Sequence, residues 1–258
     1  MKKLVSICFA VALILILALP SGIVAAEPPQ KPITPNDLKE LTFVHYAKPD
    51  KPPGKPDNPG KPDDPEPPPE VDNSYYELLG LYLPGNVTYH VNTKGAPAGA
   101  IAEIESAFEA WDAWTTVDLF NLPAEQTDVS GIVYDGQNTV SWVKIVPRNI
   151  IAITSIWYLD DGESTTLDEI VEFDIVFNAM LKWGVDQDGE DGEYVLEKAF
   201  DVRNIATHEV GHVAGLGDLY EEKYREITMY GYGEKGETLK ISLEEGDRLG
   251  IQAIYEQD

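Results

Sequence analysis

Hydrophobic and polar residues follow two different periods in the C-terminal three quarters of the chain. Residues 87–91 (VTYHV) alternate between apolar and polar positions, as a half-buried strand does. In residues 97–114, apolar side chains instead recur every three or four positions, which predicts an amphipathic helix with its apolar face on the core. The apolar positions of this predicted helix are Ile101, Ile104, Ala107, Phe108, Trp111 and Trp114.

Four further strands and two further helices are predicted downstream. The strands fall at residues 131–134, 140–146, 151–158 and 172–177, and continuous apolar runs such as 150–153 (IIAI) indicate strands covered on both faces. One helix is expected over residues 202–214, with Asp201 as its N-cap and Gly215 at its end. The last is expected over residues 243–255, with Ser242 and Glu245 forming a capping box. This order predicts an α+β domain with a twisted mixed β-sheet over residues 71–258.

The first 26 residues have the pattern of a targeting segment. Lys2 and Lys3 precede an apolar run at residues 4–19, and small residues stand at 24–26 (VAA). This pattern favours a cleaved secretory signal over an uncleaved N-terminal anchor, because the run is short for a bilayer span. The protein is therefore expected to be secreted or extracellular, with cell-surface tethering as the alternative.

Residues 27–70 divide into an arm and a linker. Residues 27–47 contain a short apolar patch (Leu41, Phe43, Val44 and Tyr46), and either a short propeptide or a disordered arm accounts for it. Residues 48–70 are dominated by Pro, Asp and Lys, which excludes regular helix and interior strand. We expect an extended, disordered spacer there, with a ligand for a proline-binding module as the alternative.

Charge and cysteine content exclude several functions. The chain has 19 Lys+Arg against 45 Asp+Glu, a formal net charge of -26, which opposes binding to nucleic acid or to an anionic membrane surface. Its single cysteine, Cys8, lies in the predicted signal. The mature chain is therefore expected to have no disulfide, no cysteine-ligated metal and no thiol nucleophile.

The most informative stretch is residues 208–218, HEVGHVAGLGD. His208 and His212 are four residues apart on a predicted helix, so both imidazoles face one side and can bind one ion. Zinc accepts such nitrogen ligands together with carboxylate oxygen. Glu209 is placed to act on a metal-activated water as a general base without being a ligand.

A catalytic zinc site needs a third protein ligand and one open position. Gly215 permits a sharp turn, which can bring Asp218 back beneath the metal. A later glutamate (Glu221, Glu222 or Glu226) is the alternative third ligand.

The motif HEVGHVAGLGD resembles the zinc-binding signature of metzincins, with Asp218 where most members carry a third histidine. Residues 227–231 (ITMYG) resemble the Met-turn of this clan, which implies that Met229 lies under the metal. Residues 100–117, 172–178 and 246–255 are similar to elements of the matrixins. The resemblance implies a zincin-like fold with an N-terminal helix, an active-site helix and a C-terminal helix. It also implies that Asp247 supports the Met-turn and that Tyr232 forms part of a substrate-pocket wall.

Two departures from the matrixin pattern concern regulation and the pocket. Matrixins are commonly kept latent by a propeptide cysteine, which the mature chain lacks. His45 in the arm is either a cap on the zinc or, as a lone histidine more commonly is, a solvated residue. The family's Pro-x-Tyr after the Met-turn is replaced by Gly231-Tyr232, which changes the expected pocket depth.

A structural calcium ion is a second metal expectation. Residues 186–193 (DQDGEDGE) offer several carboxylates on a glycine-rich turn, although their spacing does not fit an EF-hand. Resemblance to the matrixins, which bind structural calcium, favours Ca²⁺ there as much as a solvated acidic loop.

Together these features predict a secreted, monomeric, zinc-dependent endopeptidase. The expected partners are protein or peptide substrates, without nucleic acid and without a membrane beyond the N-terminal segment. The alternative is a catalytically silent, zinc-containing surface binding protein of the same fold. An intact Glu209 argues against that alternative, because a binding protein does not need a general base.

Overall fold

The computed structural model describes residues 37–48, 75–163, 166–186 and 198–256. The predicted signal, most of the predicted linker and most of the acidic turn therefore lie outside the described residues. In the part of the chain that is described, no helix is long and apolar enough to cross a bilayer.

An eight-stranded mixed sheet forms one layer of the domain. Its strand order is β10-β1-β6-β7-β5-β3-β4, and β2 pairs with β7. The strands are β1 (Leu38–Ala47), β2 (Leu81–Tyr82), β3 (Tyr89–Val91), β4 (Glu125–Gln126), β5 (Asn138–Val143), β6 (Ile150–Leu159), β7 (Asp168–Asn178) and β10 (Tyr232–Gly233). Strand β6 pairs antiparallel with both of its neighbours, whereas β7, β5, β3 and β4 pair parallel. A separate parallel pair joins β8 (Trp183–Gly184) to β9 (Phe200–Asp201).

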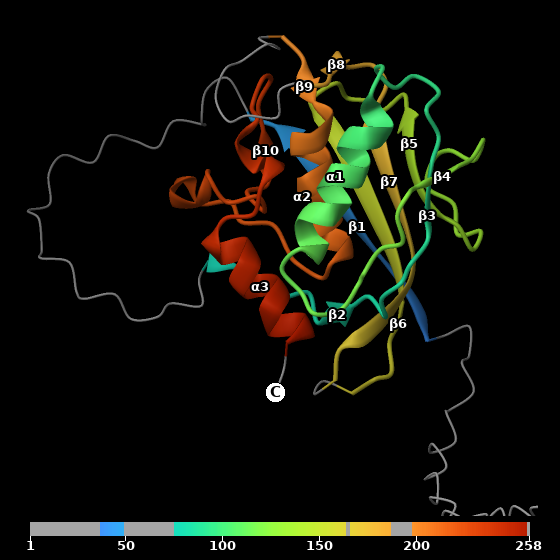
Figure 1. Cartoon of the computed structure of the whole chain (residues 1–258), viewed down its shortest axis with the longest axis vertical. Helices are drawn as coiled ribbons and strands as arrows, with labels where there is room; N and C mark the ends of the chain where they lie inside the picture. Colours follow the sequence, from blue (N-terminus) through green and yellow to red (C-terminus); the bar gives the residue numbers. More distant parts are fainter. Residues whose placement is uncertain (1–36, 49–74, 164–165, 187–197, 257–258) are drawn as a thin grey trace, which may run out of the picture. The chain divides into compact units, whose positions relative to one another are not determined.

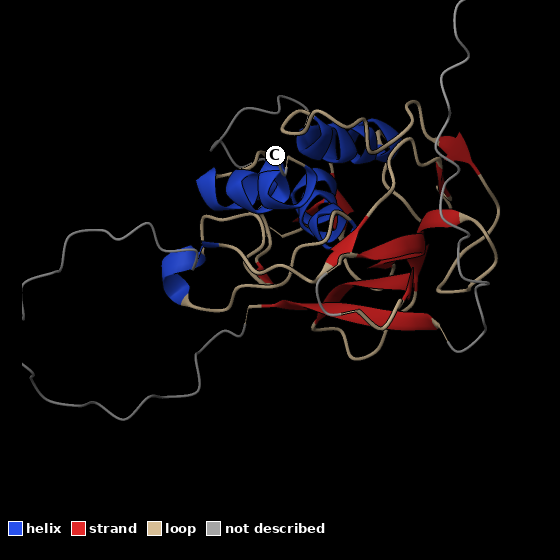
Figure 2. Ribbon diagram, turned by 90° about the horizontal axis from the view of Figure 1, so that it is seen from below, coloured by secondary structure: helices blue, strands red, loops and turns tan. Residues whose placement is uncertain are grey.

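Helices form a second layer against one side of the sheet (Figure 2). Helices α1 (Ala100–Asp112) and α2 (Val202–Val213) lie next to each other and cover the sheet, and α3 (Glu245–Tyr255) follows near the C-terminus (Figure 1). Two short 3₁₀ helices, η2 (Glu222–Tyr224) and η3 (Leu239–Ile241), lie between α2 and α3.

The core lies between these layers and explains why α1 forms where predicted. Its apolar stripe is buried, with Ile104, Phe108 and Trp111 fully inaccessible to solvent. Phe108 stacks on Tyr89 of β3 at 3.9 Å between ring centroids, and the Trp111 indole N–H donates to the Thr207 carbonyl of α2. The sheet, α1 and α2 are therefore fixed to one another by large aromatic side chains.

The α+β class, the mixed sheet and the three helices are confirmed, and three local predictions are wrong. Residues 131–134 form a loop, not a strand, because side chains of β7 accept the loop's backbone N–H groups: Asp174 binds Val133 and Glu172 binds Asp135. The capping box of α3 consists of Glu244 and Asp247 instead of Ser242 and Glu245. Strand β5 ends at Val143, short of the expected residue 146.

Strand β1 is an element that the sequence pattern did not predict. Residues 38–47 form ten residues of regular strand between β6 and β10. For these residues, a disordered arm is therefore the wrong alternative.

Candidate metal centre and catalytic base

Helix α2 places both histidines on a buried, fixed scaffold. The Asp201 side chain caps its start by accepting the backbone N–H of Asn204 at 2.8 Å, as the sequence predicts. His208 and His212 then lie one turn apart, with ring centroids 4.9 Å from each other and planes at 87°. Both side chains are almost completely inaccessible to solvent.

A glycine turn ends α2 and redirects the chain toward the histidines. Gly215 has φ 100°, and the backbone N–H groups of Gly215 and Leu216 bond back to His212 and Gly211 at 3.0 and 2.9 Å. This is the Schellman pattern that glycine favours after a helix. A Cβ at residue 215 would also lie 2.5 Å from the Leu81 carbonyl oxygen. Both the backbone angle and the close packing therefore require glycine here.

Asp218 returns to the two imidazoles after this turn. Its Oδ1 lies 3.2 Å from Nε2 of His208 and 3.6 Å from Nε2 of His212. Ligands of a tetrahedral ion with bonds of about 2.0–2.1 Å are about 3.3–3.4 Å apart. The two distances from Asp218 thus match edges of a ligand tetrahedron, and all three ligand atoms lie within 4.8 Å of one another.

Hydrogen bonds on the far side of each ring fix its orientation. Nδ1 of His208 donates to the Thr228 carbonyl at 2.8 Å, and Nδ1 of His212 donates to the Leu216 carbonyl at 2.9 Å. The proton on Nδ1 leaves the Nε2 lone pair free for a metal, and such second-shell partners are typical of metal sites. The Tyr220 hydroxyl holds the other oxygen of Asp218 at 2.8 Å.

The protonation states also suit a divalent cation. Burial lowers the pKa of His208 and of His212, which favours the neutral, metal-binding form. Burial alone would raise the pKa of Asp218, but positive charge at its side, here from protonated His208 and His212, holds that pKa below its usual range, and a bound cation would have the same effect. The site is therefore expected to present two neutral nitrogens and one carboxylate.

Buried, unsatisfied atoms support a zinc ion at this point. Nε2 of His208 and Oδ1 of Asp218 are both buried, and despite their proximity neither has an aligned hydrogen-bond partner. An unsatisfied buried polar atom is costly, so a cation that binds both would remove a penalty. Two imidazole nitrogens and one carboxylate oxygen are a donor set of catalytic zinc. The residues present therefore fit zinc.

Glu209 lies beside this triad and is completely buried. Its Oε2 accepts a hydrogen bond from the Thr154 hydroxyl of β6 at 2.6 Å, and its Oε1 accepts one from Nδ1 of His45 at 2.9 Å. Burial is the largest influence on Glu209 and raises its pKa. Within the described residues, His45, His208 and Glu209 form a second group with metal-ligand spacing next to the triad.

The predicted Met-turn packs directly under α2. Met229 is buried, and a Cβ on Gly211 would lie 2.2 Å from its sulfur, so the glycine at the fourth position of HEVGH gives this side chain its space. Asp247 of α3 accepts the backbone N–H groups of Thr228 and Met229 at 2.9 and 3.1 Å. The chain segment below the triad is thus attached to α3 by one carboxylate.

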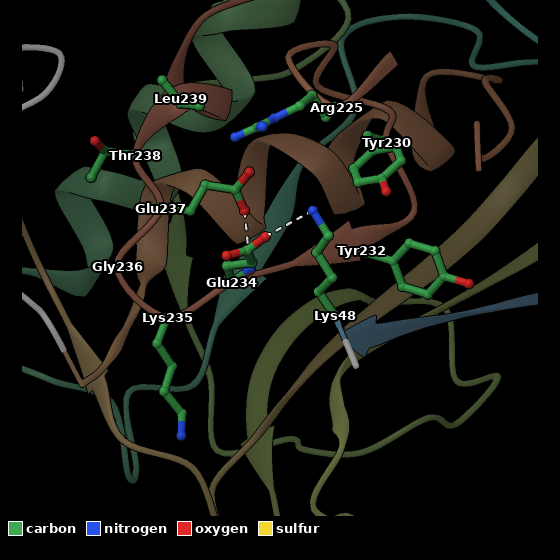
Figure 3. Close-up of a pocket in the computed structure, with 10 residues that line it drawn as sticks. All are labelled: Lys48, Arg225, Tyr230, Tyr232, Glu234, Lys235, Gly236, Glu237, Thr238 and Leu239. Atoms are coloured by element: carbon green, nitrogen blue, oxygen red, sulfur yellow. Dashed lines mark hydrogen bonds and ion pairs between the residues drawn. The ribbon is translucent and has the colours of Figure 1, made fainter. Parts of the chain in front are cut away.

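Tyr232 lies on β10, at the edge of a pocket beyond the Met-turn (Figure 3). The pocket has a volume of about 310 Å³. Tyr230 and Tyr232 pack edge to face at 5.7 Å between ring centroids. The residues that line it are Lys48, Arg225, Tyr230, Tyr232, Glu234, Lys235, Gly236, Glu237, Thr238 and Leu239.

The alternative third ligands do not approach the histidines. Glu221, Glu222 and Glu226 are all exposed. Glu222 instead accepts hydrogen bonds from Lys48 and from the Tyr230 hydroxyl. Among the described residues, the one carboxylate grouped with both His208 and His212 is Asp218.

Three residues near the site were not assigned there from the sequence: Phe43 of β1, Thr154 of β6 and Tyr220 after Asp218. His45, for which the sequence left a zinc cap or a solvated residue open, contacts Glu209 beside the triad. His45 is 2% exposed, so its interpretation as a solvated residue is wrong. Thr154 carried no signal, because an ordinary strand threonine reaches Glu209 only across 55 positions of chain.

The predicted calcium segment is described only at its start. Asp186 is buried and its backbone N–H donates to the Asp201 carboxylate at 3.1 Å. Residues 187–193 lie outside the described residues, so the calcium site stays a prediction.

The comparisons with known proteins agree with this geometry. A search of curated proteins finds no significant match. The family model for matrixin peptidases matches residues 82–256, about two thirds of the chain, and includes the whole triad and the Met-turn. The chain therefore belongs to the matrixin family of metallopeptidases.

Proposed function

We propose that this protein is a secreted zinc endopeptidase that uses Glu209 as its general base. The observation that carries the proposal is the convergence of His208, His212 and Asp218 on one point, with the Glu209 carboxylate beside them. Membership of a metallopeptidase family supports the same chemistry.

In this proposal the three ligands hold zinc, which when bound polarises the substrate carbonyl and activates water. Glu209 accepts the proton of the attacking water and passes it to the leaving amine. The raised pKa of Glu209 suits this role, because a base must both gain and lose a proton near the working pH. The Thr154 hydroxyl at 2.6 Å keeps the carboxylate in place.

The surrounding residues have supporting roles in the proposal. Met229 and Asp247 give the triad a rigid base, since Asp247 ties the Met-turn to α3. Tyr232 forms part of the wall of a substrate pocket, next to Tyr230. Secretion rests on the lysine-led apolar segment of residues 1–26 and is tested by N-terminal sequencing of the exported protein, which should begin after Ala26.

Replacing the base separates a peptidase from a silent binding protein. We expect Glu209→Gln to reduce kcat for a denatured protein substrate about 10²- to 10⁴-fold, because the amide cannot take up a proton. Zinc content should stay near that of the wild type. The matched control is Glu109→Gln on the exposed face of α1, which should change neither quantity. Because β1 covers Glu209, kcat of both variants is measured before and after the chain is cut within residues 48–70, the predicted linker.

Replacing the third ligand tests the metal assignment. Asp218→Ala should weaken zinc binding at least about 100-fold, a loss beyond the range seen on removing outer-shell partners. Glu222→Ala is the control, since Glu222 belongs to the alternative ligand set and is exposed. Zinc affinity that survives Asp218→Ala but falls with Glu222→Ala would refute the proposed site.

A further inference from the structure

Strand β1 pairs with the sheet beside the candidate site. It runs antiparallel to β6 along its whole length, from Leu38 opposite Leu159 to Tyr46 opposite Ile150. At its C-terminal end it also pairs parallel with β10, through Tyr46 and Ala47. Without β1, the strand order would leave β6 as an exposed edge. An exposed strand edge is a general binding surface for extended peptides.

The inward face of β1 covers the metal ligands. The Phe43 ring stacks on the His212 ring, with centroids 3.9 Å apart and planes at 9°. Two residues later, the His45 ring lies 4.0 Å from the His208 ring. With β1 in place, His208 and His212 are no more than 1% exposed. A substrate carbonyl therefore has no access to the two histidines from this side, whereas Asp218 remains 10% exposed.

His45 also forms a hydrogen bond with the proposed general base, Glu209. Its Nδ1 bonds to Oε1 of Glu209 while the Thr154 hydroxyl bonds to Oε2, so both carboxylate oxygens already have a partner. The Glu209 side chain is fully buried under this contact. His45 therefore competes with a water for one of the two oxygens that would receive the proton. The contact of His45 is thus with the base and not with the carboxylate ligand Asp218.

A second contact, made by Lys48, fixes the C-terminal end of residues 38–48, the described segment that is called the arm from here on. Figure 3 shows Lys48 extending into the pocket beside Tyr230 and Tyr232 and pointing toward Glu234. Its Nζ lies 3.1 Å from Glu234 and 3.2 Å from Glu222. The arm therefore contributes Lys48 to the lining of the pocket and His45 to the contact with the base.

The position of the arm in the chain fits a separable segment. Residues 38–48 lie outside the matrixin match, which begins at residue 82. The proline-rich sequence of residues 48–70 stands between the two. A segment joined through such a linker can leave the sheet without breaking a connection inside the matched domain.

We propose that residues 38–48 are an intramolecular inhibitor that binds as an added strand, with His45 capping the general base Glu209. This inference rests on the proposed peptidase function and extends it to the regulation of the same site. The arm blocks the base and the substrate path together, a latency that requires no cysteine. Activity then requires that the arm be cut or displaced.

The first experiment releases the arm in the full chain. A recognition sequence for a site-specific protease is placed within residues 55–60, and the folded zinc-loaded protein is assayed before and after cutting. We expect kcat/KM for an unstructured peptide to rise at least about tenfold on cutting and washing, since a bond to a charged group and a covered site are removed. Uncut His45→Ala should rise in the same direction.

Two further variants separate the His45 contact from a general loosening of the strand. His45→Asn keeps an N–H donor close to the position of Nδ1 and should restore part of the inhibition that His45→Ala loses. Glu40→Ala changes an exposed residue of the same strand and should leave activity at the wild-type level.

The second readout does not depend on activity. A fluorescent peptide of residues 36–48 should bind the cut and washed protein in fluorescence anisotropy, and the His45→Ala peptide should bind about tenfold more weakly. In the uncut protein, hydrogen exchange should show protected β6 amides that lose protection when the arm is removed. The Glu40→Ala peptide should bind like the wild type.

The outcomes distinguish the two proposals. Equal activity before and after cutting, with no peptide binding, would overturn the inhibitor and leave the peptidase intact. Peptide binding that depends on His45, with no hydrolysis by the zinc-loaded cut protein, would refute the peptidase while retaining the arm site. Unfolding of the domain on arm removal, seen as loss of the cooperative thermal transition, would show that β1 is a structural strand and would overturn the inhibitor.

Discussion

Strand β6 has two neighbours, and the difference between them separates a structural strand from a displaceable one. Both β7 and β1 pair antiparallel with β6 over most of its length. Eight of the eleven residues of β7 are buried, whereas β1 buries one of its ten, His45. The two strands thus make similar backbone hydrogen bonds but differ in side-chain burial.

This difference matters because backbone hydrogen bonds and buried apolar contacts do not cost the same free energy when a strand leaves the sheet. Backbone hydrogen bonds to β6 can be exchanged for bonds to water or to a substrate strand at a small net cost. Apolar side chains of β7 find no such replacement, because their transfer to water costs about 25 cal/mol per Å². Strand β7 should therefore leave the sheet only when the domain unfolds, and β1 should leave it earlier.

The largest expected effect comes from truncating one phenylalanine on each strand. Phe173 of β7 is completely buried against Phe108 and Phe120, so Phe173→Ala should lower the free energy of unfolding by about 3–5 kcal/mol. Phe43 of β1 is partly buried, so Phe43→Ala should lower it by about 1 kcal/mol or less. Urea unfolding monitored by tryptophan fluorescence measures both.

The comparison would be broken if the two variants lost similar stability, since β1 would then belong to the cooperative core. The slope of the free energy against urea serves as a control. It should be unchanged in both variants if each remains a two-state folder.

The sequence predicts β7 but not β1 for a physical reason. Residues 170–177 of β7 (IVEFDIVF) include six β-branched or aromatic apolar residues in eight positions, a content typical of a strand. In β1 the inward positions are Leu41, Phe43 and His45, and the outward ones include Val44 and Tyr46, so apolar residues stand on both sides of the alternation. The alternation of apolar and polar residues is also interrupted at His45, a polar residue that faces inward and contacts Glu209.

The candidate ligands could be predicted because their geometry is local. A four-residue helical spacing and a glycine turn bring His208, His212 and Asp218 together within eleven residues. The partners of Glu209 come from distant strands, and pairing across 55 and 164 positions leaves no local pattern. The loop at residues 131–134 was mispredicted for the same reason, since carboxylates of β7 determine its conformation.

A smaller effect concerns pH and the carboxylate Asp174 of β7. Burial raises the pKa of Asp174 to about 7, although the backbone N–H groups of Val133 and Thr139 partly oppose the shift. The folded state then holds a proton that the unfolded state has released. The contribution of Asp174 to stability should therefore fall as pH rises from about 5 to about 7, by on the order of 2 kcal/mol, whereas the lowered pKa values of His208 and His212 act in the opposite direction.

Unfolding curves at several pH values in constant salt measure this slope. Asp174→Asn should remove most of it, because the amide does not titrate. Asp112, whose pKa burial raises to about 6, should account for the slope that remains below pH 6. A stability difference between the wild type and Asp174→Asn that did not fall as pH rises would contradict the assigned direction. The exposed Glu40 of β1 is the matched control, and Glu40→Gln should leave the slope unchanged.

The smallest expected effect is at the Lys48 ion pairs that fix the arm. The Lys48 side chain is 29% exposed, and its partners Glu222 and Glu234 are 63% and 54% exposed. Exposed ion pairs contribute about 0.2–1 kcal/mol and are screened by salt. Lys48→Ala should therefore weaken binding of the 36–48 peptide about threefold at low salt and hardly at all at 0.5 M salt.

Lys39→Ala, at the exposed opposite end of β1, is the control for overall charge. An equal loss in both variants would mean that the acidic protein, with its net charge of -26, attracts any basic arm. A loss confined to Lys48 would place the attraction at Glu222 and Glu234, and the weakness of that contact would itself keep β1 easier to displace than β7.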